Sequence, residues 1–335
     1  MYSRLKYFAF ASFLLLLFSY SLQDIGLIYP SYFPKPVYDF KKNPLKSATV
    51  QLGRKLFYDP ILSRNNTISC SSCHNSGQAF SHAGNHLSKG IEDGIGDRNS
   101  PAIFNLAWQK NFMWDGVIPN IDAQALAPIN HPMEMGEDIN VAVRRLNKSK
   151  EYRTLFYRSF GDSLATSERL MKALSQFQLT IVSASSKYDK VKQKKAQFTD
   201  SEKRGYLLYQ QNCNSCHSEP LFSTYDFANN GLPVDSKLDD HGKWNKSFEP
   251  ADQWMFKIPS LRNLGFTYPY MHDGRFKTLN EVLDHYEKGI VKSPTLAKQL
   301  EKPIIFNHKE REDLLSFLAT LNDSVLVSNP DYQKK

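Results

Sequence analysis

The sequence predicts a mainly α-helical protein in which two similar halves follow one another along the chain. A five-residue unit, Cys-x-x-Cys-His, occurs twice, at 70–74 and at 213–217. Apolar residues elsewhere recur at spacings of three or four, the period of an amphipathic helix, and the alternation typical of strands is scarce. The 335 residues are enough for two domains that each bury a hydrophobic core.

The repeated unit is the attachment signature of a c-type haem. Its two thiols lie about one helical turn apart, so each can add to a vinyl group of the haem while the adjacent His binds the iron. A single copy could instead be a zinc site or a redox-active dithiol. Here both copies include the His, and together they use all four Cys of the protein. The sequence therefore predicts two cytochrome c-like haem domains in tandem, with haem c attached through Cys70, Cys73 and His74 and through Cys213, Cys216 and His217.

Residues 1–22 have the pattern of an export signal. Arg4 and Lys6 precede an apolar run that reaches Phe18, and no charged residue follows before Asp24. The run is also just long enough to remain as a membrane anchor. Because covalent haem attachment takes place outside the bacterial cytoplasm, we expect a periplasmic protein, either soluble or tethered by this segment.

The formal net charge of +8 does not indicate a nucleic-acid-binding protein. Haem propionates would offset part of it, and the sequence has no arginine-rich helix or stripe of interleaved aromatic and basic residues. A basic surface could equally meet an acidic electron donor.

The first haem domain is expected to span residues 40–186. Apolar residues between 50 and 57 form a stripe at helical spacing. Residues 78–97 are rich in Gly, Ser and Asn and are predicted to form a loop. Two amphipathic helices should follow, one over Val141–Phe160 and one over 170–181.

The second haem domain is expected to span residues 196–325. The preceding stretch, 187–195, contains five Lys and is interpreted as a solvated boundary between the domains. The segment 226–257 is polar, irregular and too long for a simple connection. Capping boxes of the form Thr-x-x-Glu and the spacing of apolar residues predict the helices of this half. They begin after Thr199, run from Thr278 to near Gly289, and span 307–321.

The two halves share more than the haem motif. Met113-Trp114-Asp115-Gly116 corresponds to Met271-His272-Asp273-Gly274, and Arg98-Asn99 corresponds to Arg262-Asn263. A repeat on this scale indicates two related domains.

The duplication predicts that the two irons differ. The residue twelve positions after Gly274 is Tyr286, whereas the residue twelve positions after Gly116 is Pro128. A Tyr phenolate can bind ferric haem iron and Pro cannot. We therefore expect a closed iron beside His217, with Tyr286 as its distal ligand, and an open iron beside His74 that can bind peroxide.

Alternatives to this assignment remain open from the residues alone. Tyr286 could be an aromatic residue of the core, as most helical Tyr are. The rival ligands of the second iron are Met271, Met255, His272 and His285. His82 and His86 lie close to His74 in sequence and could close the first iron, although His in a glycine-rich loop is more often a surface residue.

Taken together, these segments resemble the bacterial di-haem cytochrome c peroxidase family, and the resemblance covers the whole exported chain. Besides the two haem motifs, the matching segments are Leu56-Phe57-Tyr58-Asp59, Arg98-Asn99-Ser100-Pro101, Trp114-Asp115-Gly116, Pro128 through Glu134, Pro259-Ser260-Leu261-Arg262-Asn263, and Tyr268 through Gly274.

The resemblance implies roles for individual residues. His74 would be the proximal ligand of the peroxide-binding haem, with Glu134 as the distal acid–base group. Gln124 and Pro128 would lie in the same pocket, and Trp114 would relay electrons between the haems. Glu134 could otherwise be a helix-start carboxylate, and Trp114 a core residue. The resemblance also implies a calcium site between the domains, whose oxygen ligands would be the side chain of Asn99 and the backbone carbonyls of Thr267 and Pro269.

Two departures from ordinary members of the family favour its MauG-like branch. Those members have Met at the position of Tyr286, and Met raises the potential of the electron-accepting haem. They also often have a distal His where this chain has Gly90-Ile91. In the MauG-like branch the first haem is ready without reductive activation.

The resemblance leads to a main functional prediction with two alternatives. The main prediction is a peroxidase that reduces hydrogen peroxide with electrons from a small periplasmic donor, either a c-type cytochrome or a cupredoxin. The alternatives are a MauG-like oxidase that acts on a partner protein and a non-catalytic electron-transfer cytochrome. A homodimer is a further expectation, because dimers are common in the family.

Overall fold

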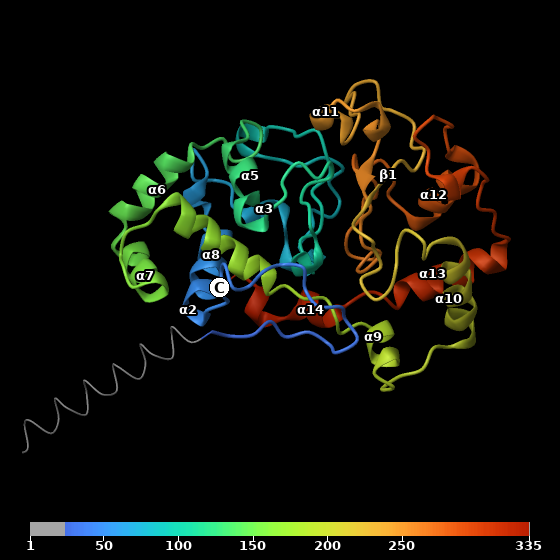
Figure 1. The fold of residues 1–335 in the computed structure, drawn as a ribbon, viewed down its shortest axis with the longest axis horizontal. Coiled ribbons are helices and arrows are strands. Elements are labelled where there is room, and N and C mark those ends of the chain that lie inside the picture. Colours follow the sequence, from blue (N-terminus) through green and yellow to red (C-terminus); the bar gives the residue numbers. More distant parts are fainter. Residues whose placement is uncertain (1–23, 335) are drawn as a thin grey trace, which may run out of the picture.

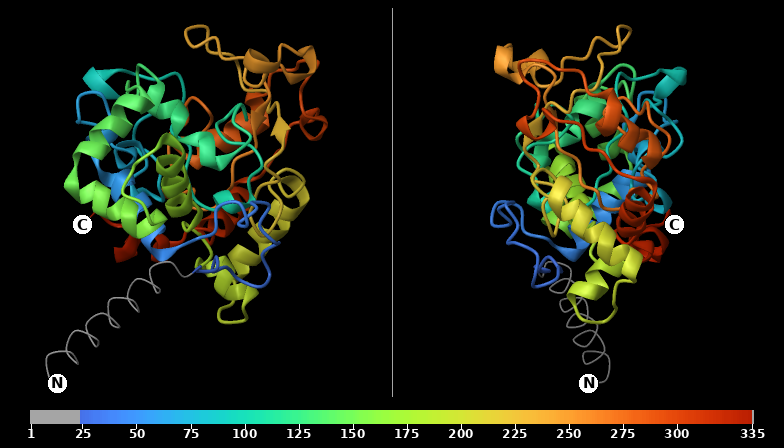
Figure 2. Two further views of the ribbon diagram at one scale, coloured as in Figure 1. Left: turned by 60° about the vertical axis from the view of Figure 1, so that its left-hand side comes forward. Right: turned by 90° about the vertical axis from the view of Figure 1, so that its right-hand side faces the viewer.

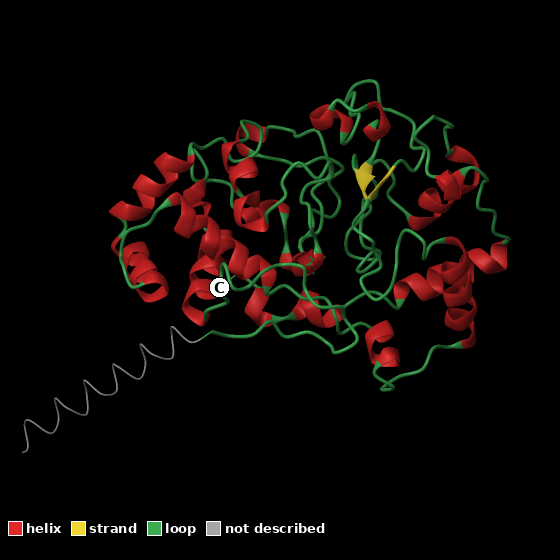
Figure 3. Ribbon diagram, viewed as in Figure 1, coloured by secondary structure: helices red, strands yellow, loops and turns green. Residues whose placement is uncertain are grey.

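The fold is mainly helical, as predicted (Figures 1 and 3). The computed structural model describes residues 24–334, so the export signal predicted over residues 1–22 lies outside the described residues. Within the described range, no helix combines the length and the apolar character needed to cross a bilayer.

Figure 1 shows two groups of helices side by side, one coloured blue to green and the other yellow to red. The helices of the first group are α2 (Ser47–Tyr58), α3 (Cys70–Cys73), α4 (Ile121–Gln124), α5 (Leu126–Asn130), α6 (Ile139–Lys148), α7 (Lys150–Phe160) and α8 (Ser167–Leu179). Those of the second group are α10 (Asp200–Asn212), α11 (Trp244–Ser247), α12 (Leu279–Asp284) and α13 (His308–Ala319), and a π-helical turn, His285–Gly289, continues α12. A short helix, α9 (Lys187–Lys192), lies between the groups.

Strand structure in the described residues is slight. β1 (Phe227–Ala228) pairs antiparallel with β2 (Phe256–Lys257), with Phe227 opposite Lys257. This pair and α11 organise the polar segment 226–257, which the sequence predicted to be irregular.

The same kind of helix contact forms the core of each group. In the first, α2 packs against α8 so closely that a Cβ atom on Gly53 would lie 1.8 Å from the carbonyl oxygen of Ala173. In the second, α10 packs against α13, and a Cβ atom on Gly205 would lie 1.9 Å from the carbonyl oxygen of Asp313. In both pairs a glycine on the helix preceding the Cys-x-x-Cys-His unit permits the close approach.

Two terminal segments join the groups. The N-terminal segment runs along the lower edge of the molecule in Figure 1 toward α9, and the hydroxyl group of Tyr32 donates a hydrogen bond to Asp189. The C-terminal helix α14 (Ser324–Ser328) returns to the first group, where Leu326 is buried in the core. Figure 2 shows the same arrangement from two further directions.

Several helix predictions are confirmed. The stripe at 50–57 lies on α2, and the capping boxes at Thr199 and Thr278 begin α10 and α12. The helix predicted over 307–321 is α13, with Asn307 as its N-cap. Residues 78–97 contain only short 3₁₀ turns, in agreement with the predicted loop.

The prediction of one continuous helix over Val141–Phe160 is wrong, because the chain breaks at Ser149. This residue has an extended conformation, and its side chain accepts a hydrogen bond from the backbone N–H of Tyr152. Ser149 thereby ends α6 and caps the start of α7. The helix predicted over 170–181 ends at Leu179, and Ile181 is buried beyond its end.

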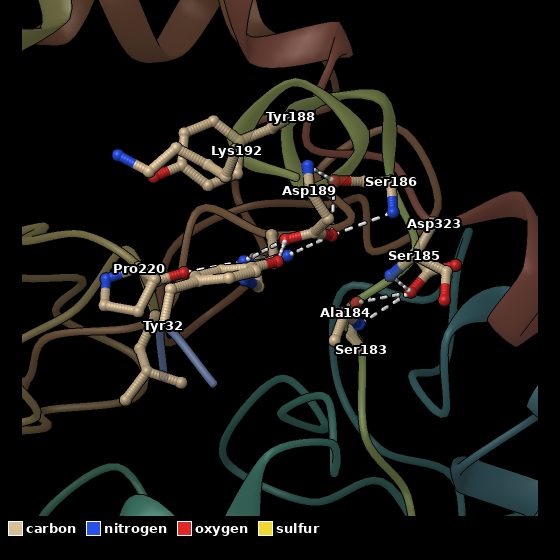
Figure 4. A network of polar contacts seen from close by, with 12 residues as sticks. Tyr32, Ser183, Ala184, Ser185, Ser186, Tyr188, Asp189, Lys192, Pro220 and Asp323 are labelled. Carbon is tan, nitrogen blue, oxygen red and sulfur yellow. Dashed lines mark hydrogen bonds and ion pairs between the residues drawn. The ribbon is translucent and has the colours of Figure 1, made fainter. Parts of the chain in front are cut away.

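The sequence predicted that the lysine-rich stretch 187–195 is solvated, but part of this stretch is buried. Most of it forms α9, which begins with a capping box between Ser186 and Asp189. Tyr188 and Asp189 point inward and are completely buried. Figure 4 shows Asp189 at the centre of a network of polar contacts that includes Tyr32 and Ser186.

Candidate haem sites and the region between them

The first Cys-x-x-Cys-His unit forms a single helical turn, α3. Ser69 and Ser72 form a capping box that begins the turn, and Cys70 and Cys73 are three residues apart on it, so their side chains lie on one face. His74 follows the turn in a non-helical conformation, and its backbone N–H donates to the carbonyl of Cys70 at 3.0 Å. This geometry places two thiols and one imidazole close together.

The His of each unit is held as an iron ligand would be. Nδ1 of His74 lies 3.1 Å from the carbonyl oxygen of Phe80, and Nδ1 of His217 lies 3.0 Å from that of Pro259. A hydrogen on Nδ1 leaves the lone pair of Nε2 for a metal, as is usual for metal-bound His. Burial lowers the pKa of both imidazoles to about 4, so both are neutral at physiological pH. Neutral imidazole is the ligating form.

The second unit borders a cavity of about 290 Å³, which we call the C-terminal cavity. Cys213, Cys216 and His217 line it, together with mainly apolar side chains. The hydroxyl group of Tyr225, also in the lining, is buried and makes no hydrogen bond within the described residues. Two thiols, one neutral imidazole, an apolar wall and an unused polar donor fit a covalently bound haem with its carboxylate groups.

Tyr286, the predicted distal ligand, lines the C-terminal cavity. It lies on the π-helical turn after α12, an irregularity that is frequent at functional sites. Burial raises the pKa of Tyr286 to about 12, and a hydrogen bond from Asn230 partly opposes this rise. Tyr286 therefore shares one cavity wall with the haem attachment residues.

The rival ligands occupy different positions. Met271 also lines the cavity, and its Sδ atom lies 3.5 Å from Nδ2 of Asn230. Nε2 of His285 is within hydrogen-bonding distance, 3.1 Å, of the carbonyl oxygen of Asn230, so this buried ring is already bonded. His272 lines the cavity but stacks on Phe256, with ring centroids 3.7 Å apart.

Met255 lies outside this set of cavity-lining residues. Its backbone carbonyl accepts a hydrogen bond of 2.8 Å from the N–H of Lys243. Of the rivals considered, Met271 therefore shares most with Tyr286, because both line the cavity and both contact the side chain of Asn230.

Glu134 lies beside the first haem motif. The loop through Lys89 and Ile91 contacts both, because Sγ of Cys73 lies 3.3 Å from the carbonyl of Lys89 and the N–H of Ile91 donates to the carbonyl of Glu134 at 2.8 Å. Burial raises the pKa of Glu134, and burial together with the charge of Glu134 raises the pKa of Cys73. The structure therefore brings the predicted acid–base group to the first site.

The backbone at Gly90 leaves no room for a side chain. A Cβ atom there would lie 2.0 Å from the carbonyl oxygen of Met133 and 2.5 Å from Cα of Glu134. A distal His at this position would therefore require the segment that carries Glu134 to move.

The two His of the neighbouring loop have different surroundings. His86 packs against the other half, where a Cβ atom on Gly274 would lie 2.3 Å from its carbonyl oxygen. His82 is close enough to His74 for its charge to lower the pKa of that ring. Nδ1 of His82 is buried without a hydrogen bond in the described chain.

Gln124 and Pro128 lie on two consecutive short helices, α4 and α5. Nε2 of Gln124 lies 3.7 Å from Sδ of Met113, the residue before Trp114. The carbonyl oxygen of Pro128 accepts a hydrogen bond of 3.1 Å from the N–H of Met135, the residue after Glu134. Gln124 thus contacts the residue before Trp114, and Pro128 contacts the residue after Glu134.

Trp114 lies where the two halves meet. Its Nε1 donates a hydrogen bond of 2.8 Å to the carbonyl oxygen of Asn99. Its own carbonyl accepts one of 2.7 Å from the N–H of Lys257 in the second half. Trp114 belongs to the first half and also lines the C-terminal cavity; its role as an electron relay stays a prediction.

The residues assigned to calcium also lie at this junction. Asn99, Thr267 and Pro269 all line the C-terminal cavity. Nδ2 of Asn99 donates to the carbonyl oxygens of Asn85 and His86 at 3.0 and 3.1 Å, which orients the side chain and leaves Oδ1 for a cation.

Lys257, which no sequence pattern identifies, is a charged residue in the lining of the C-terminal cavity. Its Nζ atom donates to Oε1 of Gln109 at 2.7 Å and to the carbonyl oxygen of Asn111 at 3.0 Å. A Lys next to an apolar strand residue is ordinary in a sequence, so no local signal identifies it.

Two Cys-x-x-Cys-His units with oriented imidazoles, a cavity beside one and a carboxylate beside the other define a class: di-haem c-type oxidoreductases. A family model described as di-haem cytochrome c peroxidase matches residues 47–197. The chain is 38% identical over 295 residues to a methylamine utilization protein MauG of Methylorubrum extorquens, covering 86% of this chain and 82% of that protein. It is 31% identical over 311 residues to a cytochrome c551 peroxidase of Nitrosomonas europaea, covering 87% and 85%. The chain belongs to the di-haem cytochrome c peroxidase family.

Solved structures agree with this assignment. A MauG-like protein associated with microbial copper homeostasis superposes with a TM-score of 0.82 and 32% identity, covering 92% of this chain and 99% of that one. The di-haem peroxidase BthA of Burkholderia thailandensis, at 21% identity and a TM-score of 0.73, shares the fold. The protein is thus a peroxidase-type oxidoreductase.

Proposed function

We propose that the protein reduces hydrogen peroxide to water at the first haem site, with electrons that a small donor delivers through the second. The observation that carries this proposal is the inequality of the two sites. Glu134 lies beside Cys73 in the first half, whereas Tyr286 lines the cavity beside His217 in the second. Residues 40–186 and 196–325 are the two cytochrome c-like domains in this proposal.

At the first site, the haem iron supplies the centre that exchanges electrons with peroxide. The side chains control its surroundings. His74, kept neutral by burial and oriented by the carbonyl of Phe80, would hold the haem iron as its proximal ligand. Glu134 accepts a proton from one peroxide oxygen and returns it to the other, a role suited to a carboxylate whose pKa is raised by burial. Gln124 and Pro128 complete the pocket, and Pro128 offers the iron no ligand.

Electrons reach the first site through Trp114. The indole is fixed by its hydrogen bond to Asn99, and its backbone is fixed by Lys257. Tyr286 would hold the second haem iron opposite His217, and that haem would supply electron storage and transfer. A calcium ion held by Asn99, Thr267 and Pro269 would stiffen this junction through oxygen ligands.

The donor in this proposal is a periplasmic c-type cytochrome or cupredoxin. The net charge of +8 suits an acidic donor surface, since opposite charges accelerate encounter. Export through the N-terminal segment, with or without its removal, accounts for a periplasmic location, and a homodimer is compatible with the proposal.

A second candidate is oxidation of a partner protein in the manner of MauG. The observation that favours it is the tyrosine at 286, together with 38% identity to a protein named MauG. A turnover assay with peroxide and reduced cytochrome c distinguishes the two functions. Consumption of peroxide with oxidation of the cytochrome supports the peroxidase, whereas consumption only in the presence of an oxidisable partner protein supports the second candidate.

A further inference from the structure

Lys257 is a lysine of the second half whose side chain is inserted into a loop of the first half. Its Nζ atom donates to Oε1 of Gln109 at 2.7 Å and to the carbonyl of Asn111 at 3.0 Å, and it lies 5.8 Å from the ring centroid of Phe112. Its backbone N–H donates to the carbonyl of Trp114 at 2.7 Å. All four contacts are made to one stretch of six residues that ends at the proposed electron relay.

The ammonium group has unusual surroundings for a lysine. It makes no ion pair within the described residues, and its acceptors are one amide and one backbone carbonyl, both uncharged. Burial lowers the pKa of Lys257 to about 7, although the charge of Asp115 acts in the opposite direction. Lys257 is half-buried, and a lysine that lines a cavity with a perturbed pKa and no ion-pair partner is a candidate for function.

We propose that Lys257 is a positioning residue for the electron relay. Lys257 holds the loop 109–114 against the second half and places a positive charge beside the path between the two haem sites. The proposal rests on the role of Trp114 in the proposed function. A positive charge favours the reduced state of a nearby redox group, so the second haem is easier to reduce while Lys257 is protonated. In an environment of intermediate dielectric constant, one unit charge at a distance on the order of 10 Å changes a one-electron equilibrium by about tenfold.

Two charged residues near Lys257 are paired with each other. Asp115 is paired with Arg98, whose Nη1 lies 2.7 Å from Oδ2 of Asp115. Burial acts to lower the pKa of Arg98, but its two carboxylate partners raise it overall. Arg98 therefore keeps its charge throughout the range in which Lys257 loses its own.

The other titratable groups near Lys257 do not change protonation state near neutral pH. Arg262 lines the same cavity and is paired with Asp189. Burial raises the pKa of Tyr225, so its hydroxyl stays neutral. His272, stacked on the strand neighbour of Lys257, has its pKa lowered to about 4 by burial. The propionates of bound haem are the same in all variants, so a difference in reduction potential between variants reports the contribution of Lys257.

The test is the reduction potential of the second haem as a function of pH, measured in holoprotein without peroxide. In the wild type we expect the potential to fall as pH rises through about 7, because Lys257 loses its charge. Lys257→Arg should keep the high potential to alkaline pH, and Lys257→Met should have the low potential throughout. Between the two variants the equilibrium between reduced and oxidised haem should differ about tenfold.

Two further variants complete the test. Gln109→Met removes one acceptor of the ammonium group, so the pH of the transition should fall by about one to two units. This variant can still test the proposal if Lys257→Met does not fold. Lys243→Met is the matched control, because Lys243 is paired with Asp252 at 2.8 Å in the same half. It should leave the profile unchanged.

A wild-type profile in Lys257→Met, or an unshifted transition in Gln109→Met, would overturn the role of Lys257. Peroxide turnover of the wild type is measured separately. Its absence would overturn the proposed peroxidase function without altering the measured potentials, so the two failures are distinguishable.

Discussion

Arg262 and Asp189 form a completely buried, bidentate ion pair at the junction of the two halves. Nη1 and Nη2 of Arg262 lie 2.9 and 2.8 Å from the two carboxylate oxygens, and both side chains are 0% exposed. Arg262 also donates to the carbonyl of Pro220 at 2.7 Å and lines the C-terminal cavity. The pair therefore fixes the wall of the second haem site to α9, the link between the halves.

The corresponding arginine of the first half is held in the same way. Nε and Nη2 of Arg98 lie 2.6 and 2.8 Å from the two carboxylate oxygens of Asp240, which belongs to the second half. In both copies of the Arg-Asn pair, the arginine thus binds an aspartate from outside its own half. Such contacts hold the two haem sites in one relative orientation.

The first prediction concerns the buried pair. Asp189→Asn should destabilise the protein by about 3–5 kcal/mol, because it leaves the guanidinium of Arg262 buried without its counter-charge. Urea unfolding followed by circular dichroism measures this change. Asp252→Asn, which removes the partner of the more exposed Lys243, is the control and should cost less than about 1 kcal/mol.

The same variant predicts a pH dependence. Burial acts to raise the pKa of Asp189, but the hydrogen bonds and charge of Arg262 outweigh it, so the pKa is lowered overall. A carboxylate with a lowered folded-state pKa stabilises the fold above its unfolded value of about 4, and this stabilisation is lost as pH falls through the folded value. The difference between wild type and Asp189→Asn should shrink below about pH 4. A difference independent of pH would contradict the ion-pair explanation.

Local chemistry explains which features the sequence could predict. The haem attachment units need only five adjacent residues, and the capping boxes at Thr199 and Thr278 need only four, so both are readable without the fold. The duplicated motifs also led to Tyr286, which lines the C-terminal cavity, while its role as an iron ligand stays a prediction.

The features that the sequence did not predict depend on distant contacts. Ser149 breaks a helix by capping the next one, although the apolar pattern runs on across it. Asp189 lies among the lysines of 187–195, so its burial is not evident from the local sequence; that burial depends on Arg262, 73 residues away. The unusual surroundings of Lys257 depend on a hydrogen bond from its side chain to Gln109, 148 residues earlier in the chain.

The second prediction tests the distal ligand. Tyr286→Phe removes the phenolate oxygen and should open the second iron, so its electron paramagnetic resonance signal should change from low spin to high spin. Tyr270→Phe is the matched control, because Tyr270 lines the same cavity while its hydroxyl group donates to the carbonyl of Leu264 at 2.8 Å. An unchanged spectrum in Tyr286→Phe would eliminate Tyr286 and direct attention to Met271.

The third prediction concerns the first iron. The proposed function predicts one high-spin and one low-spin haem in the ferric wild type, because in it Pro128 offers no ligand to the first iron while Tyr286 closes the second. His82→Ala should leave the high-spin signal unchanged. Two low-spin signals that become one on removal of His82 would show that its imidazole, near His74, occupies the open position.

The fourth prediction concerns proton transfer at the first site. Glu134→Gln should lower peroxide turnover by about 10²- to 10⁴-fold, the range typical of an acid–base group, without loss of haem. Burial raises the pKa of Glu134, so in the wild type activity should fall as pH drops through a value above the ordinary range of a glutamate, where the carboxylate becomes protonated. This acid limb should be absent from the residual activity of Glu134→Gln. Glu92→Gln, which alters an exposed ion pair with Arg64 in the adjacent loop, is the control. Full turnover in Glu134→Gln would assign the proton transfer to another group.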